Sequence, residues 1–418
     1  MQSETRLQKH EIKEVQETTC CIVGGGPAGA VLALLLARQD IPVMLLEAHM
    51  DFDREFRGDT VHPSVMEIMD EIGLAGQLLQ LPHTEMHHVS AQTAQGIVKV
   101  ADFDVLKRKY PYVTVMPQVE FLNFITQEAR RYPCFCQVMG AQVDELIEEN
   151  GVIRGVRYRG QDGWYEVRAA LTVGADGRFS RIRKLAGFEP IKTSPPMDVL
   201  WFRLTRKPSD AEEAFGRFGN GMILAVINRA DHWQIGYVIP KGGYQQIRAA
   251  GLEQVRKDIA QTIPEFADRV DELKEWKQIS VLSVESSRIP RWYRPGLLLI
   301  GDAAHVMSPV GGVGINYAIQ DAVVAANVLS GKLKYGIVSQ KDLAEVQRQR
   351  ELPTKFIQAI QSFVQQAVLA TALNAPQAFT VPVWVRFLLS IPFVRTIPAR
   401  IVGYGLFPAH VKKAYVAH

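Results

Sequence analysis

Residues 19–47 read TCCIVGGGPAGAVLALLLARQDIPVMLLE. An apolar stretch up to Val23 is followed by a glycine-rich turn, a second apolar stretch at 31–37, and a third that ends at Glu47. The first and third stretches have the length of strands, and the middle one follows a proline, as the start of a helix often does. The pattern therefore predicts a strand, a tight turn, a helix, a second strand and an acid at its end, which is the order of parts in a dinucleotide site.

Three glycines and one acid carry that prediction. Gly24 permits the tight turn, Gly26 lets the backbone approach a pyrophosphate, and Gly29 lets the helix pack closely on the strand. The helix N-terminus offers free N–H groups and a partial positive charge to the same pyrophosphate. Glu47 lies 18 residues after Gly29, where a carboxylate accepts hydrogen bonds from both ribose hydroxyls. A turn packed only for stability is the alternative interpretation.

Two further motifs decide which dinucleotide is expected. Residues 297–322 read LLLIGDAAHVMSPVGGVGINYAIQDA, and residues 171–187 read LTVGADGRFSRIRKLAG. In this order and spacing, the three motifs resemble those of the flavin-dependent aromatic hydroxylases of the para-hydroxybenzoate hydroxylase superfamily, which includes the ubiquinone-biosynthesis hydroxylases. The resemblance runs over about residues 18–345. It implies FAD as the resident cofactor of the first site.

Composition agrees with a cytoplasmic enzyme. With 418 residues, 47% apolar and 22% charged, the chain is long enough to bury a sizeable core and to divide into two or more domains. A net charge of +3 without a long basic run argues against a nucleic-acid partner. The four cysteines lack a partner pair at zinc spacing, so we interpret them as reduced structural thiols. Residues 1–17 have no apolar core of signal-peptide length.

The order of elements predicts an α/β fold. We expect a doubly wound, Rossmann-like FAD domain, a second mixed β-sheet that forms the substrate domain, and a helical C-terminal segment. The FAD domain is discontinuous because the strand at 297–300 returns to it after the second sheet. The predicted ranges are 18–90, 117–190 and 285–345 for the FAD domain, 91–116 and 191–284 for the substrate domain, and 346–418 for the C-terminal segment.

The Gly-Asp motif carries most of the predicted chemistry. Its strand ends at Asp302, whose carboxylate can hydrogen-bond the ribityl chain, although a helix N-cap is the alternative. The next helix should direct its first N–H groups at the flavin pyrimidine ring and stabilise the reduced form. By resemblance, the Pro309 carbonyl lies where substrate is hydroxylated, and His305 is a structural histidine near the cofactor rather than a base. The predicted flavin contacts of this segment are Gly312, Gly314, Ile315 and Asn316.

Other family contacts match single residues. Arg57 matches the arginine after the second strand that contacts the cofactor and helps to hold the mobile ring; a solvated loop charge is the alternative. Gln118 matches a polar residue that reaches FAD from a helix start, unless it is an ordinary helix-terminal residue. Val143 falls on the strand that packs near adenine, or it is a plain core valine. Pro27 and Ala28, at the start of the first helix, complete the set of predicted FAD contacts.

The motif at Asp176 and Gly177 has another role by resemblance. In this family it serves both the FAD site and the approach of NAD(P)H, whose pyrophosphate needs local positive charge. The residues that supply such charge are Arg178, Arg181, Arg183 and Lys184. A solvated basic helix start is the alternative for each of them. Because no second glycine fingerprint follows a strand, NAD(P)H is expected to bind as a transient co-substrate.

The resemblance also implies the reaction. NAD(P)H reduces FAD, the reduced flavin takes up O2, and a flavin C4a-hydroperoxide transfers one oxygen to an electron-rich aromatic or quinone-like ring. The protein orients the reactants and excludes water, and the sequence marks no catalytic base. Trp201 and Tyr237, on predicted strands of the second sheet, are candidates for lining the substrate pocket, although aromatic residues on strands also serve as plain core.

The C-terminal segment is unusually apolar. No residue from Phe356 to Val385 is charged, and the apolar trend continues to Val411. Glutamines, an asparagine and prolines interrupt the stretch, which argues against a membrane span. Three interpretations stay open: a helical cap on the FAD domain, a homodimer interface, and a peripheral membrane contact that collects a lipophilic substrate.

Rival functions use related folds. A flavin halogenase needs a lysine after the first helix and a Trp-x-Trp-x-Ile-Pro string, but the chain has no lysine between Lys13 and Lys99 and reads WQIGYVIP at 233–240. A binding protein of the GDP-dissociation-inhibitor type would not need the Gly-Asp motif. An FAD-dependent oxidase or reductase of the same fold would use the same FAD residues, and the sequence leaves that alternative open.

Overall fold

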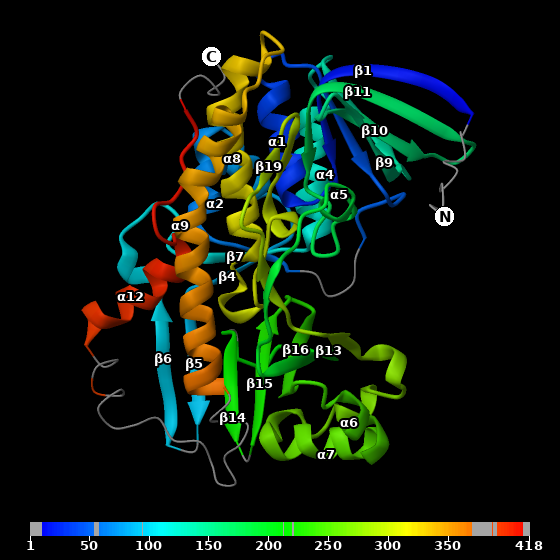
Figure 1. Ribbon diagram of the computed structural model, residues 1–418. Coiled ribbons are helices and arrows are strands. Elements are labelled where there is room, and N and C mark those ends of the chain that lie inside the picture. Colours follow the sequence, from blue (N-terminus) through cyan, green and yellow to red (C-terminus); the bar gives the residue numbers. More distant parts are fainter. Residues whose placement is uncertain are drawn as a thin grey trace.

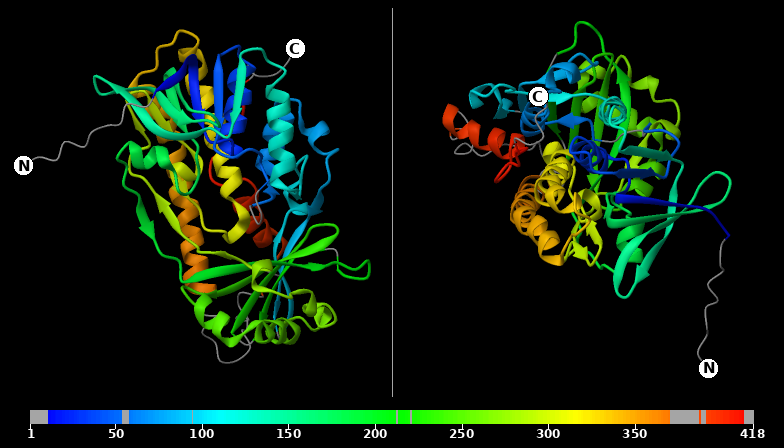
Figure 2. Two further views of the ribbon diagram at one scale, coloured as in Figure 1. Left: turned by 90° about the vertical axis from the view of Figure 1, so that its right-hand side faces the viewer. Right: turned by 90° about the horizontal axis from the view of Figure 1, so that it is seen from above.

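The computed structural model describes residues 11–53, 58–93, 95–211, 213–219, 221–369, 387 and 391–412. Two large sheets organise these residues, the first in the upper half and the second in the lower half of Figure 1. Helices α8 (Gly314–Leu333) and α9 (Gln340–Val364) pack against each other along one side. Figure 2 shows that α9 extends from the level of the first sheet to that of the second.

The first sheet has eight strands and contains the glycine turn. Its neighbours run in the order β19 (Tyr293–Arg294), β20 (Leu297–Leu299), β11 (Trp164–Gly174), β1 (Ile12–Val23), β2 (Val43–Glu47) and β8 (Phe135–Met139), with β10 (Val152–Arg159) on β11 and β9 (Gln142–Glu149) on β10. β20, β11, β1, β2 and β8 are mutually parallel. Parallel strands need crossover connections, and the helix after the glycine turn supplies the first of them.

Helix α1 (Pro27–Ala37) begins directly after the glycine turn and is buried in the core. Every residue from Ala28 to Ala37 is buried, as expected for a helix that is apolar on all sides. It packs against the sheet, α4 (Gln118–Ala129) and α8. The N-terminus of α1 is therefore fixed in position by the core of the domain.

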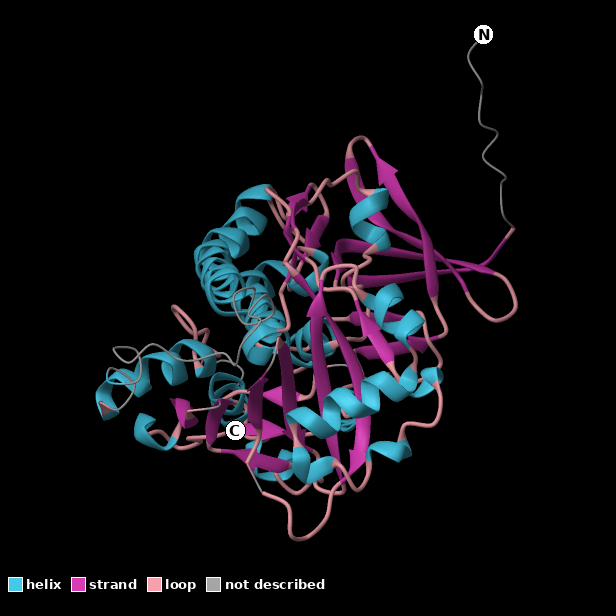
Figure 3. Cartoon of the chain, turned by 90° about the horizontal axis from the view of Figure 1, so that it is seen from below, coloured by secondary structure: helices cyan, strands magenta, loops and turns pink. Residues whose placement is uncertain are grey.

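The second sheet joins segments that are far apart in the sequence. Its order is β17 (Ser280–Leu282), β13 (Met197–Thr205), β16 (His232–Pro240), β15 (Met222–Asn228), β14 (Phe215–Gly219), β5 (His88–Thr93) and β6 (Gly96–Asp102). Figure 3 shows α6 (Tyr244–Ala250) and α7 (Leu252–Thr262) across one face of this sheet. The other face packs against Val310, in the turn before α8.

Smaller elements connect the two sheets. One three-stranded sheet contains β3 (Thr60–Val61), β7 (Val113–Val115) and β4 (Thr84–Met86), and another contains β12 (Ile191–Thr193), β18 (Ser286–Arg288) and β21 (His305–Val306). The remaining α-helices are α2 (Pro63–Glu71), α3 (Ala75–Leu78), α5 (Arg181–Leu185) and α12 (Pro392–Gly403). The hairpin β5–β6 therefore belongs to the second large sheet, whereas β7 pairs with β3 and β4.

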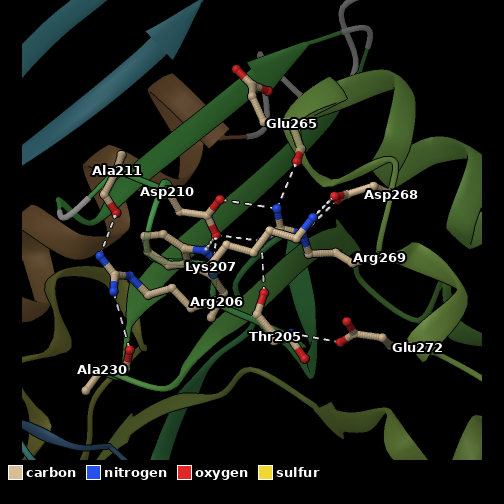
Figure 4. A network of polar contacts seen from close by, with 11 residues as sticks. Thr205, Arg206, Lys207, Asp210, Ala211, Ala230, Glu265, Asp268, Arg269 and Glu272 are labelled. Atoms are coloured by element: carbon tan, nitrogen blue, oxygen red, sulfur yellow. Dashed lines mark hydrogen bonds and ion pairs between the residues drawn. The ribbon is translucent and has the colours of Figure 1, made fainter.

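A buried ion-pair network fixes the helix-covered side of the second sheet (Figure 4). The Arg269 side chain is 4% exposed and donates to the Asp210 carboxylate at 2.5 and 3.2 Å and to the Thr205 carbonyl at 3.0 Å. The indole of Trp233 also donates to Asp210, at 2.9 Å. Burial alone would raise the pKa of Asp210, but these donors lower it to about 2. The loop after β13 is thereby tied to the segment after α7.

Candidate functional site

The glycine turn has the geometry that its sequence predicts. Gly24 has φ +106°, and a Cβ there would lie 2.4 Å from the Ala175 carbonyl oxygen. A Cβ on Gly29 would lie 1.9 Å from the Gly24 carbonyl oxygen, whereas one on Gly26 would have no protein atom within 4 Å. Packing therefore requires the first and last glycines. The middle glycine faces open space at the N-terminus of α1, where an anion binds favourably.

Glu47, the last residue of β2, points back to this turn. Its side chain accepts hydrogen bonds from the Gly25 N–H at 2.8 Å and the His49 N–H at 3.1 Å, and the residue is buried. Pro27 and Ala28 are the first residues of α1 and follow the turn directly. The strand, the turn, the helix and the acid thus lie together as the sequence predicts.

The loop after β20 lies against the N-terminus of α1. Asp302 is half-buried in a single 3-10 turn at Gly301–Ala303. A Cβ on Gly301 would lie 3.3 Å from the Ala28 Cβ. The Gly-Asp motif and the glycine turn are therefore neighbours in space, although some 270 residues separate them.

A buried charged triad holds this loop in place. Asp321 of α8 is fully buried and accepts from the Gly301 N–H at 3.0 Å, from Arg350 Nε at 2.8 Å and from His305 Nε2 at 2.6 Å. Burial would raise the pKa of Asp321, but His305 and Arg350 lower it. His305 is thus a structural residue here. Sequence reasoning missed Asp321 and Arg350; the one weak signal was that Asp321 is the single carboxylate of α8.

The segment from Pro309 to Asn316 contains the turn before α8 and the first residues of that helix. Gly311 and Gly312 have φ of +79° and +63°, a conformation that favours glycine. Asn316 is buried, and its side-chain oxygen accepts from the His62 N–H at 2.8 Å. A Cβ on Gly314 would meet only the Met307 Cβ, at 3.9 Å. The side of Gly314 is therefore open, as a cofactor ring would require.

The Asp176 side chain accepts hydrogen bonds from the start of helix α5. Its carboxylate accepts from the Ser180 hydroxyl at 2.5 Å and from the N–H groups of Arg181 and Ile182 at 2.6 and 3.0 Å. Burial raises the pKa of Asp176. These contacts cap the N-terminus of α5, so the side chain positions the loop.

Arg183 does not serve the role that the sequence predicts. The residue is buried, and its guanidinium donates to the carbonyl oxygens of Ala303 at 3.0 Å and Arg178 at 2.7 Å. It therefore ties the Asp-Gly loop to the Gly-Asp loop and is not available for a pyrophosphate. Arg181 forms an exposed ion pair with Asp144 at 2.9 Å.

Two other predicted FAD contacts, Gln118 and Val143, lie near the glycine turn, and a third, Arg57, is not among the described residues. Gln118 begins α4, and its side-chain amide donates to the Gly58 carbonyl at 3.1 Å. Val143 is buried on β9, just after a segment whose Ala141 N–H donates to the Glu47 carbonyl at 2.8 Å. Arg57 lies outside the described residues.

Trp201 and Tyr237 lie on opposite faces of the second sheet. Tyr237 belongs to the apolar core between the sheet and α7. Trp201 instead packs in a cluster with Val199, Val238 and Val310 of the turn before α8. Trp201 therefore faces the turn before α8, whereas Tyr237 lies in the core on the other face, and the role of either residue in a substrate pocket stays a prediction.

The face that carries Trp201 has a row of small residues. Trp201 pairs with Gly236, Gly236 with Ala225, and Ala225 with Gly216. Directly paired residues of antiparallel strands point to the same side. A Cβ on Gly236 would lie 2.8 Å from the Trp201 ring, so the indole lies over that glycine. The indole therefore covers Gly236, and a Cβ on Gly216 would lie 3.3 Å from the Phe218 ring, so Ala225 lies between two aromatic side chains.

Residues 391–412 pack against α2 and the start of α8. His62 Nδ1 lies 2.7 Å from the Val402 carbonyl oxygen, and burial lowers the pKa of His62 to about 4. A Cβ on Gly311 would lie 3.7 Å from the Val402 side chain, and the Ala409 N–H donates to Gln320 at 3.2 Å. The described part of this segment therefore covers the start of α8. Among the described residues, no helix is both long and apolar enough to cross a membrane.

Comparison with known proteins agrees with this geometry. A family model described as "FAD binding domain" matches residues 17–351. The chain is 37% identical over 358 residues to 6-methylpretetramide 4-monooxygenase from Streptomyces rimosus, and the match covers 85% of each protein. It is 26% identical over 310 residues to pentachlorophenol 4-monooxygenase from Sphingobium chlorophenolicum, with 72% of this chain and 56% of that longer protein covered.

Among solved structures, p-nitrophenol 4-monooxygenase PnpA from Pseudomonas putida DLL-E4 has a TM-score of 0.73. The two share 19% of their residues over 93% of this chain and 94% of that one, a likeness that shows the fold alone. The family match spans most of the chain, and the two relatives are named monooxygenases, so the oxidase or reductase alternative is not favoured. FAD is confirmed as the cofactor. The chain belongs to the FAD-dependent aromatic hydroxylases, the flavoprotein monooxygenases that use NAD(P)H and O2.

Proposed function

We propose that the chain hydroxylates a flat, multi-ring aromatic compound in the space between the second sheet and the turn before α8. The relative with 37% identity acts, by its name, on 6-methylpretetramide, an aromatic polyketide. The observation that carries the proposal is the pair of half-buried aromatic side chains, Trp201 and Phe218, that flank Ala225 on one face of the sheet. A fused ring system can stack against such aromatic rings.

We propose that FAD lies across the adjoining loops. The N-terminus of α1 stabilises the pyrophosphate, and Glu47 accepts hydrogen bonds from the ribose. Nothing in the protein itself requires a glycine at Gly314, which supports the approach of the flavin ring at that point. The full set of proposed contacts is Gly24, Gly26, Pro27, Ala28, Gly29, Glu47, Arg57, Gln118, Val143, Asp302, Gly312, Gly314, Ile315 and Asn316, with Asp176 positioning its loop.

The remaining work of the protein is orientation and electrostatics. Bound FAD supplies the activation of dioxygen. The first N–H groups of α8 stabilise negative charge on the flavin pyrimidine ring. Pro309 belongs to the turn that packs on the second sheet through Val310. We propose that its carbonyl group lies beside the substrate edge that is hydroxylated. The triad around Asp321 and the guanidinium of Arg183 keep both loops in position without touching the reactants.

We also propose a co-substrate and a cellular compartment for the enzyme. NAD(P)H is a transient co-substrate that approaches the Asp-Gly loop, and the chain works in the cytoplasm, where its four free cysteines stay reduced. The contacts of residues 391–412 support a cap on the fold for that part. A dimer interface or a membrane contact remains a prediction for residues 370–386 and 388–390, which lie outside the described residues.

A substrate panel tests the proposal. NAD(P)H oxidation and product mass would be measured with phenols of one ring and with phenolic compounds of three or four fused rings. We expect kcat/KM to favour the multi-ring compounds at least about tenfold, because only they can reach both aromatic side chains, and tenfold corresponds to about 1.4 kcal/mol. Efficient, coupled hydroxylation of one-ring phenols with no turnover of larger ones would contradict it.

A further inference from the structure

A histidine and two aspartates lie together outside the proposed flavin site. His88 opens β5, Asp102 ends β6, and Asp104 begins the turn that follows. One potential ligand atom from each residue lies within 4.8 Å of the others. Neighbouring strands of one hairpin bring the first two side chains together, so the arrangement depends on regular pairing and not on a loop.

The two inner side chains lack hydrogen-bond partners. His88 and Asp102 are 15% and 14% exposed, and their Nδ1 and Oδ1 atoms lie 3.5 Å apart. Neither of these two atoms has a hydrogen-bond partner among the described residues, and both are inaccessible to water. Buried polar atoms are normally paired, so this pair calls for an explanation. Two ligands of one tetrahedral ion, with bonds of about 2.0–2.2 Å, lie about 3.4 Å apart.

More negative charge surrounds the same histidine. Glu213, just before β14, has its carboxylate 3.6 Å from His88 Nε2, and Asp104 lies 3.9 Å from that atom. His87 binds the other oxygen of Asp104 at 2.6 Å and lies 3.3 Å from Glu85. The local charge therefore favours a cation, and His87 orients one carboxylate, as residues behind a metal ligand do.

We propose that His88, Asp102 and Asp104 bind one divalent transition-metal ion, for which Zn²⁺ is the probe. Imidazole with carboxylates suits Zn²⁺ and related ions, whereas Mg²⁺ and Ca²⁺ prefer oxygen ligands alone. His88 and Asp102 are paired residues of β5 and β6, so an ion bound by both would join the two strands of this hairpin. The site is structural and takes no part in oxygen transfer.

Calorimetric titration of the full-length, FAD-loaded enzyme tests the proposal. After treatment with a chelator and dialysis, ZnCl2 should bind with one equivalent, and MgCl2 at the same concentrations should not. Bound Zn²⁺ at a hundredfold excess over Kd should raise Tm by roughly 2–5 °C. His88→Ala should weaken Zn²⁺ binding at least about tenfold.

Two further variants keep the test decisive. Asp102→Asn preserves side-chain shape if His88→Ala fails to fold, and it should weaken Zn²⁺ binding by a similar factor. His232→Ala removes a histidine that is paired with Asp231 at 2.8 Å, and it should bind Zn²⁺ like the parent. No saturable binding, or equal binding in Asp102→Asn, would identify an adventitious ion only and overturn the proposal. None of these residues is a proposed FAD contact, so flavin content and hydroxylation report separately on the function.

Discussion

The glycine turn and the second sheet show two ways of building a binding surface. In the turn, the residues that shape the site are near one another in the sequence, and Gly29 touches Gly24 directly. In the second sheet, the surface arises where Trp201 meets Gly236, and this sheet also takes in β5 and β6 from a remote segment. The first surface is dictated by local backbone geometry, and the second by the register of strands.

Register explains why the second surface is harder to predict. Side chains alternate between the two faces of a strand, so a shift of one residue moves a side chain to the other face. Trp201 pairs with Gly236, whereas Tyr237 pairs with Leu200, the next position along both strands. The pairing therefore assigns one aromatic to the open face and the other to the core.

The largest expected effect separates two glycines of the same turn. Gly29→Ala should destabilise the apoprotein by more than about 4 kcal/mol, because its Cβ would lie 1.9 Å from the Gly24 carbonyl. Gly26→Ala should leave the stability of the apoprotein unchanged within about 0.5 kcal/mol and weaken FAD binding, since its Cβ meets only open space. Thermal unfolding without FAD and flavin titration measure the two effects. Equal stability of both apoprotein variants would contradict the account.

The buried ion pair of the second sheet gives the next effect. Asp210→Ala leaves Arg269 buried without its main partner and should cost about 3–5 kcal/mol in the free energy of unfolding. The folded pKa of Asp210, about 2, is below its ordinary value of 3.8. Its contribution is therefore present above about pH 4 and is lost as the pH falls through about 2. Denaturant unfolding at pH 7 and an acid titration check both statements; a variant as stable as the parent would refute them.

These two regions also show how much could be predicted. The turn, Glu47 and the loop at Asp302 follow from residue types at fixed spacing, because only glycine fits the close approaches. The triad of Asp321, Arg350 and His305 joins two helices and a short strand, and its one weak signal was the single carboxylate of α8. Arg183 was predicted to supply charge for the NAD(P)H pyrophosphate because sequence does not show burial. Its actual partners are main-chain carbonyl groups, which no residue type reveals.

A substitution on the open face tests the substrate surface. Gly236→Val would push against the Trp201 ring, because a Cβ there lies only 2.8 Å away. We expect kcat/KM for multi-ring substrates to fall about 10–100-fold, equivalent to about 1.4–2.7 kcal/mol, with FAD retained. Tyr237→Phe, on the opposite face, is the matched control and should keep the parent value within about threefold. The reverse pattern would mean that the wrong face was assigned.

The smallest expected effect is a pH dependence at the C-terminal cover. The folded pKa of His62, about 4, is below its ordinary value of 6.5 because the neutral ring is buried. The associated stability is present above pH 6.5 and falls as the pH drops from 6.5 toward 4. Between pH 7 and 5.5 this amounts to about 1 kcal/mol. Tm measured over this range should decline less in His62→Gln; identical profiles would exclude His62 as the cause.

Oxygen-isotope labelling tests the central claim most directly. The FAD-loaded enzyme would be supplied with NAD(P)H and its best multi-ring substrate under ¹⁸O2, and the product would be analysed by mass spectrometry. The account predicts a product with one added oxygen atom that comes from the labelled gas, formed in proportion to NAD(P)H consumed. An oxidised product without label, together with stoichiometric peroxide, would contradict it, as would a reduced product formed without oxygen.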